Sequence, residues 1–153
     1  MSAAVSANAS PSAVSVADAE TAAIAAYQGM WIDMSKAAET ANWQDPALGS
    51  HAADSALAEL VKILKSDDQQ GAVLKGGPPV MHPDVDTALP LSSPTVVTVS
   101  DCLGSQHWLL YRKSTGALWD DKPGGNRTVT AQVIQSQGTW KVNSFTAGDL
   151  GTC

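Results

Sequence analysis

The hydrophobic period of this chain changes near Gly71 from helical to extended. Before Gly71, apolar residues recur every three or four positions, which predicts two amphipathic helices at residues 16–43 and 51–66. After it, β-branched and aromatic residues alternate with other residues, which is typical of strands. Two helices followed by mainly antiparallel strands predict an α+β fold, in which the helices cover one face of a strongly curved sheet.

Both predicted helices carry boundary signals. Ser15 and Asp18 resemble a capping box with Asp in place of the usual Glu, and Pro46 closes the first helical region. The stripe of the first helix that should face the core consists of Ile24, Tyr27, Trp31, Met34, Ala38 and Ala41. The stripe of the second helix consists of Leu57, Leu60, Val61 and Leu64, and Asp67, Asp68 and Gly71 end this helix.

Four extended segments follow, and the last two form a hairpin. The segments lie at 96–99, 107–112, 129–133 and 139–146, with a tight turn at Ser136-Gln137-Gly138. In the last segment, alternation places Trp140 and Val142 on one face and Lys141, Asn143 and Phe145 on the other. The earlier segment 72–91 contains four prolines and two glycines, so it can form only a short or broken strand.

Length and charge exclude several classes of protein. The 153 residues are enough for one domain with one core, and 44% apolar against 16% charged residues excludes a disordered polyelectrolyte. Apolar runs fall short of the ~18 residues that a membrane helix needs. A formal charge of −6 argues against nucleic-acid binding, which depends on clustered Lys and Arg. We expect no nucleic-acid partner and no transmembrane segment.

Cysteine and histidine usage bears on metal binding and on compartment. Cys102 and Cys153 are the only two cysteines, and a disulfide between them would hold down the C-terminus. Two unrelated free thiols are the alternative. The three histidines stand far apart, without Cys-x-x-Cys or His-x-x-x-His spacing, so neither a metal site nor a cofactor is expected.

The first residues have the composition of a spacer. Residues 1–15 are rich in Ala and Ser and show neither the basic region nor the apolar core of a secretory leader. We interpret them as a flexible tether, with a single folded domain at 16–153. Such spacers are common between an exported bacterial domain and its anchor, so we expect a leader that is missing from this sequence. A cytosolic protein with a flexible tail is the alternative.

The residues of the C-terminal half carry a resemblance to a known superfamily. They are Asp101-Cys102, Trp108, Tyr111, Gly116, Asp120-Asp121, Pro123-Gly124-Gly125, Arg127, Thr130-Ala131, Gly138, Trp140-Lys141-Val142 and Cys153. Residues 18–153 resemble the nuclear transport factor 2-like superfamily, and within it a group of secreted actinobacterial lipoproteins of uncharacterised function. The resemblance implies a cone-shaped, cystatin-like α+β fold, a Cys102–Cys153 bridge and export to the cell surface or beyond it.

The same resemblance implies a pocket at the wide end of the cone. Its predicted lining residues are Tyr27, Trp31 and Met34, together with Trp108 or Tyr111, depending on which strand face points inward. An aromatic stripe at helical spacing is also what ordinary core packing produces. Some relatives of this fold are isomerases, cyclases or hydrolases that use a buried carboxylate or histidine. Asp33, Asp101 and His107 are the weak catalytic candidates here, and none lies in an enzyme motif.

The loop at 113–126 is a second candidate site. Trp119, Asp120 and Asp121 lie on a glycine-rich acidic turn, where Trp119 could anchor a protein partner. Alternatively, Trp119 folds back over the edge of the sheet and the two carboxylates are only solvated.

Three functions are compatible with these patterns. The leading hypothesis is an exported, non-catalytic binding or interaction module whose partner is a small apolar ligand or a protein. The first alternative is a small-molecule enzyme that uses the cone pocket. The second is a scaffold component of a secretion or conjugation assembly, for which we expect a homodimer through the open face of the sheet.

Overall fold

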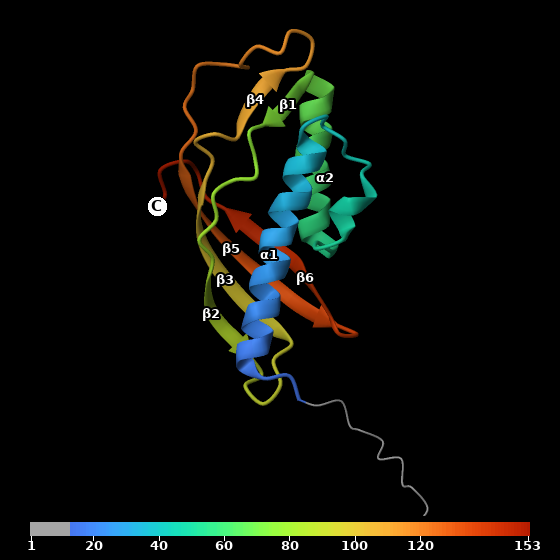
Figure 1. Ribbon diagram of the computed structural model, residues 1–153, viewed down its shortest axis with the longest axis vertical. Helices are drawn as coiled ribbons and strands as arrows, with labels where there is room; N and C mark the ends of the chain where they lie inside the picture. Colours follow the sequence, from blue (N-terminus) through green and yellow to red (C-terminus); the bar gives the residue numbers. More distant parts are fainter. Residues whose placement is uncertain (1–12) are drawn as a thin grey trace, which may run out of the picture.

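The protein has an α+β fold, as its sequence predicts. The computed structural model describes residues 13–153, so the prediction for residues 1–12 of the tether lies outside the described part. Helix α1 (Val16–Ala38) lies across one face of a sheet, and helix α2 (Asp54–Gln70) lies beside it (Figure 1). A short 3-10 helix, η1 (Pro46–Gly49), lies between them in the chain.

The strands form two antiparallel sheets. The main sheet has the order β2-β3-β5-β6, with strands β2 (Asp84–Leu89), β3 (Val96–Gly104), β5 (Asn126–Ser136) and β6 (Thr139–Ala147). The small sheet pairs β1 (Ala72–Lys75) with β4 (Leu109–Arg112) at one end of the molecule (Figure 1). The segment at 72–91 is therefore broken into two short strands, as its prolines and glycines predict.

The helix boundaries differ from the predicted ones. The amide of Asp18 donates to Ser15 Oγ at 3.0 Å, which confirms the predicted cap. However, α1 ends at Ala38 instead of residue 43, because Ala41 adopts a positive φ of 50° and the chain turns there. Helix α2 begins at Asp54 instead of residue 51 and ends at Gln70 instead of residue 66, where Gly71 caps it with a φ of 74° that glycine readily adopts.

The late start of α2 has a cause in the sheet. Val142 of β6 donates its amide to the carbonyl of His51, and the amide of Ala53 donates to the carbonyl of Val142. Residues 51–53 thus pair with β6 and cannot be helical. This pairing also covers part of the edge of β6, which would otherwise expose unpaired backbone groups.

A bulge in β6 changes the face on which one predicted residue lies. Gln132 pairs with Ser144 and Val133 pairs with Val142, which leaves Asn143 as an extra residue between them. Phe145 therefore lies on the same face as Val142, towards the core, and not on the face with Lys141. The predicted alternation is wrong beyond Asn143 for this reason.

The core lies between α1 and the main sheet. Small residues on the inner face of α1 let the helix approach the strands closely: Ala19, Ala23, Ala26, Ala37 and Ala38 are all buried. The facing strands contribute the buried side chains Val97, Val99, Val129, Val133 and Val142. Val14 also packs against this core and donates its amide to Ser93 Oγ at 3.1 Å. The packed domain therefore includes Val14, which the sequence assigns to the tether.

The C-terminal segment is held against the start of β5. Cys102 and Cys153 form the expected disulfide, with their Cα atoms 5.9 Å apart. Gly148 donates its amide to the carbonyl of Thr128, and Gly151 donates to the carbonyl of Asn126. Neither helix within residues 13–153 combines the length and apolar character needed to cross a membrane.

The bridge should make a large contribution to stability. It closes a loop with a sequence separation of 51 residues, which corresponds to about 4 kcal/mol in the chain-entropy treatment. We expect the double variant Cys102→Ser/Cys153→Ser to melt about 10 °C lower than the wild type in circular dichroism or calorimetry. Reductant should lower the melting temperature of the wild type and leave that of the double variant unchanged. Equal melting temperatures with and without reductant would contradict this expectation.

Candidate ligand-binding cavity

A cavity of about 650 Å³ opens at the end of the main sheet that lies next to the small sheet. Its floor consists of buried or half-buried apolar side chains that come from α1, β3, β6 and the segment leading into β4. They are Trp31, Met34, Leu103, Trp108 and Phe145. The volume lies within the range of about 300–1,000 Å³ that is usual for small-molecule sites.

The rim of the cavity is more exposed and contains the charged groups. Leu118 and Leu150 are 49% and 46% exposed, an unusual exposure for two leucines that border the same cavity. The ionisable side chains along the cavity are Glu59, Asp120, Lys122 and Arg127. Apolar side chains thus form the floor, and the charged side chains lie at the rim, where they are half-buried or exposed.

Trp31 is the central side chain of the floor. It is only 4% exposed and makes edge-to-face contacts with three other aromatic rings. The ring centroids of Tyr27, Trp108 and Phe145 lie 6.4, 6.2 and 5.4 Å from that of Trp31. Such geometry is favourable for aromatic quadrupoles. Trp31 therefore joins α1 to β6 and to the segment before β4.

A buried carboxylate lies behind this aromatic cluster. The Tyr27 hydroxyl donates to Asp101 Oδ2 at 2.8 Å, and the backbone amide of His82 donates to Oδ1 at 2.8 Å. Asp101 is only 6% exposed, because it points from β3 towards the core. Each carboxylate oxygen thus has a donor, as a buried charge requires.

This contact changes the ionisation of Tyr27. Burial raises the pKa of the Tyr27 hydroxyl far above its ordinary value of 10.0, and the negative charge of Asp101 raises it further. The indole N–H of Trp31 opposes a small part of this rise, although it does not complete a hydrogen bond with the hydroxyl. Tyr27 is therefore a permanent donor to Asp101 at physiological pH.

Of the five residues predicted to line a pocket, three line the cavity and two do not. Trp31, Met34 and Trp108 line the cavity. Tyr27 is buried behind the floor, where Asp101 holds its hydroxyl. Tyr111 is half-buried and does not line the cavity, so Trp108 belongs to the inward face of this segment.

The three weak catalytic candidates do not meet in one place. His107 is exposed at a turn before β4, which begins at Leu109 and not at residue 107 as predicted. Asp101 is occupied by Tyr27 and His82. Asp33 lies on α1, where its Oδ2 is 2.6 Å from His51 Nδ1. None of the three lines the cavity.

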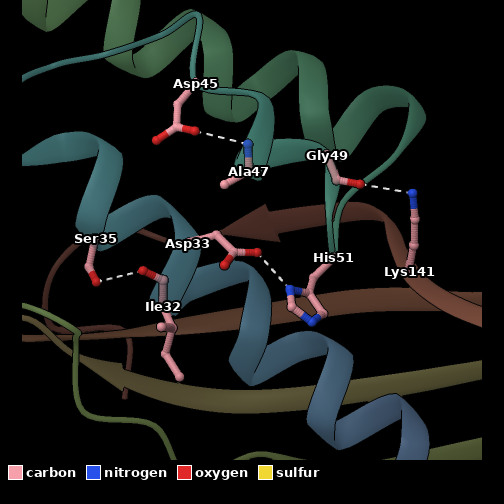
Figure 2. Close-up of polar contacts among 8 residues, drawn as sticks. All are labelled: Ile32, Asp33, Ser35, Asp45, Ala47, Gly49, His51 and Lys141. Carbon is pink, nitrogen blue, oxygen red and sulfur yellow. Dashed lines mark hydrogen bonds and ion pairs between the residues drawn. The ribbon is translucent and has the colours of Figure 1, made fainter.

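The contact between Asp33 and His51 is one of the polar contacts that hold the segment at 45–53 in place, and it joins this segment to α1 (Figure 2). The His51 ring lies so close to Gly29 that a Cβ there would be 2.7 Å from it, which explains the glycine. Lys141 Nζ donates to the carbonyl of Gly49 at 2.8 Å and fixes the same segment to β6 (Figure 2). This geometry indicates a structural role for the pairing of Asp33 with His51.

The loop after β4 folds back onto the sheet. Trp119 is half-buried, its amide donates to the carbonyl of Leu110, and the Arg112 guanidinium lies 4.6 Å from the centre of its ring. Asp120 and Asp121 are exposed, and Asp120 Oδ1 accepts the amide of Lys122. This arrangement agrees with a folded-back tryptophan beside a solvated acidic turn. Within residues 13–153, acidic, histidine and cysteine side chains form no cluster of three suited to a metal ion.

One further carboxyl group is perturbed, and it lies away from the cavity. Burial raises the pKa of Asp67 in the last turn of α2 to about 6. Perturbed groups often mark functional sites, but Asp67 does not line the cavity. The end of a helix is also an unfavourable place for a negative charge.

The sequence did not point to several residues that line the cavity. Alternation places Phe145 on the face opposite Val142, because the bulge at Asn143 has no signature in the sequence. Glu59 lacks a local signal, whereas Leu103 continues the alternation of Val97 and Val99 on the inner face of β3. Arg127 also has a local signal, because it lies two residues before Val129 and four before Ala131, at a position that alternation assigns to the inner face.

The fold and the cavity define an α+β domain with an open apolar site. No family model matches the chain, and no curated protein matches it significantly. Among solved structures, the chain is similar to the intermembrane space region of the chloroplast protein ARC6, with a TM-score of 0.56 and 14% sequence identity. The match covers 84% of this chain and 95% of that chain. At this identity the similarity concerns the fold alone.

Replacement of Trp31 should test its central position. We expect Trp31→Ala to lower the free energy of unfolding by about 3 kcal/mol, because three aromatic contacts are lost in the core. Trp119→Ala is the matched control, and it should cost only about 1 kcal/mol, because Trp119 is half-buried under one cation. Urea unfolding measures both values. Equal costs for the two variants would contradict the assignment of Trp31 to the core.

The raised pKa of Tyr27 predicts a loss of stability at high pH. Above pH 10 the unfolded chain loses the Tyr27 proton while the folded protein retains it, so unfolding becomes easier as pH rises. From pH 10 to 11 this effect should lower the free energy of unfolding by about 1 kcal/mol. Tyr27→Phe should lack this component in urea unfolding at both pH values. If the free energy of unfolding falls equally with pH in the wild type and in Tyr27→Phe, the raised pKa of Tyr27 does not contribute to the loss.

Proposed function

We propose that this protein is an exported, non-catalytic module that binds a small apolar ligand in the cavity. The observation that carries the proposal is the combination of an open volume of about 650 Å³ with an apolar, aromatic floor. A site of this kind gains affinity from the apolar surface that it removes from water. Leu118 and Leu150 extend the apolar surface to the rim.

The arrangement of ionisable groups supports binding over catalysis. A general acid or base must reach the substrate, and in an apolar pocket its pKa moves towards neutrality. Asp101, the buried carboxylate closest to this description, has both oxygens occupied and lies outside the cavity lining. The ionisable groups of the rim are half-buried or exposed to solvent.

The proposed location outside the cytoplasm is supported by the disulfide. Disulfides persist mainly in oxidising compartments, and Cys102–Cys153 accounts for both cysteines of the chain. The proposed membership of the nuclear transport factor 2-like superfamily rests on the sequence resemblance, and a cavity walled by α1 and sheet residues is compatible with it. Neither the partner nor a homodimer through the sheet follows from these observations, and both stay predictions.

A binding experiment with a cavity-filling variant tests the proposed function. Ala147 pairs with Val129 on the inner face of the main sheet, lines the cavity and is exposed, so a larger side chain there can enter the cavity without disturbing the core. We expect the neutral dye N-phenylnaphthylamine to bind the wild type with increased fluorescence. Ala147→Trp should weaken this binding at least tenfold.

The control variant is Thr130→Trp. Thr130 is exposed on the outer face of β5 and does not line the cavity, and the added ring is the same. It should bind the dye as the wild type does. If Ala147→Trp and Thr130→Trp bind with equal affinity, the cavity is not the binding site.

A further inference from the structure

We propose that the ligand of the cavity is an amphipathic carboxylic acid, whose carboxylate pairs with Arg127 and whose apolar chain lies on the aromatic floor. This inference rests on the proposed binding function and adds the chemical class of the ligand. It is based on the position of Arg127, on its lack of a partner among residues 13–153 and on the distribution of the other charges around the cavity.

Arg127 occupies a position that the pattern of β5 reserves for apolar residues. Along this strand Val129, Ala131 and Val133 are buried, and the alternate residues between them are exposed. Arg127 continues the buried series and pairs with Leu103 of β3, which is itself buried in the cavity floor. The strand therefore directs a guanidinium group towards the cavity at the boundary between its floor and its rim.

The guanidinium of Arg127 has no ion-pair or hydrogen-bond partner in the part of the chain that the structure describes. Among residues 13–153, the ion pairs are those of His51 with Asp33 and of Lys113 with Asp68, and no side-chain hydrogen bond involves Arg127. A guanidinium has five N–H donors, and leaving them unpaired in a half-buried position is unfavourable. An acceptor supplied by a ligand would remove this cost.

The other charged groups of the cavity are Lys122, Asp120 and Glu59, and the exposed Lys122 offers an anion a more hydrated site than the half-buried Arg127 does. Asp120 is exposed, and its carboxylate already accepts the amide of Lys122. Glu59 approaches from α2 and is not within ion-pair distance of Arg127. A ligand carboxylate would be repelled by Glu59 and attracted by Arg127, so the acid should lie on the β5 side.

A carboxylate suits this position better than other acceptors. The planar guanidinium can donate two parallel hydrogen bonds to the two oxygens of a carboxylate, and such charge-assisted pairs are among the strong polar contacts in proteins. The rest of the ligand would lie against Trp31, Leu103 and Phe145, which offer no charged group. The cavity therefore matches a molecule with one anionic end and an apolar body.

Three ligands with the same chain and different head groups test this inference. We would measure the binding of dodecanoate, dodecanol and dodecyltrimethylammonium by isothermal titration calorimetry, at concentrations below micelle formation. The wild type should bind dodecanoate at least tenfold more tightly than dodecanol, and the cation most weakly. Arg127→Gln should weaken dodecanoate binding about tenfold or more and leave dodecanol binding unchanged.

Two further variants control for net charge and for folding. Lys62→Gln removes one positive charge from an exposed position of α2 outside the cavity, so it should bind dodecanoate as the wild type does. Arg127→Lys keeps the charge but lacks the planar guanidinium, so its affinity for dodecanoate should lie between those of the wild type and Arg127→Gln. The comparison of the three ligands in the wild type does not depend on any variant being folded.

The outcomes separate the two proposals. If dodecanoate and dodecanol bind the wild type equally and Arg127→Gln changes neither, the inference about the acid is wrong and the apolar cavity site stands. If neither binds, and the dye also fails to bind, the proposed function is wrong together with the inference. A drop in dodecanoate affinity of the same size in Lys62→Gln would also overturn the assignment to Arg127.

Discussion

The contact of Trp31 with three aromatic rings is the interaction on which the rest of this structure depends. It fixes α1 against Phe145 of β6 and against Trp108, which leads into β4, so it ties both sheets to one helix. Behind it, the hydrogen bond from Tyr27 to Asp101 sets the rotation of α1 over β3. Trp31, Trp108 and Phe145 also form part of the cavity floor, so the packing that stabilises the domain shapes the cavity as well.

Much of this architecture is present in the sequence, because it follows from local periodicity. The change of period at Gly71 predicts the α+β class, the cap at Ser15 marks the start of α1, and the terminal cysteine indicates the bridge. Of the site, Trp31, Met34 and Trp108 were predicted as lining residues and do line the cavity. The resemblance to a known superfamily implies a pocket at this end of the fold, and helical spacing and strand alternation indicate which side chains can face it.

The other features depend on contacts between distant parts of the chain. The bulge at Asn143 moves Phe145 to the inner face, and its cause lies in the register with β5. The pairing of Asp33 with His51 joins residues 18 apart through a turn that no local pattern specifies. Likewise, β4 pairs with β1 because the glycine- and proline-rich segment redirects the chain away from the main sheet. Periodicity describes an element, whereas register and pairing are properties of two elements.

The bridge between Cys102 and Cys153 has a consequence for the site as well as for the fold. The tail that it holds carries Leu150, which forms part of the cavity wall. A newly made chain with both thiols reduced would have its helices and strands but no covalent anchor for that wall. Oxidation therefore adds a covalent anchor to this border of the cavity, next to the hydrogen bonds that Gly148 and Gly151 donate to β5.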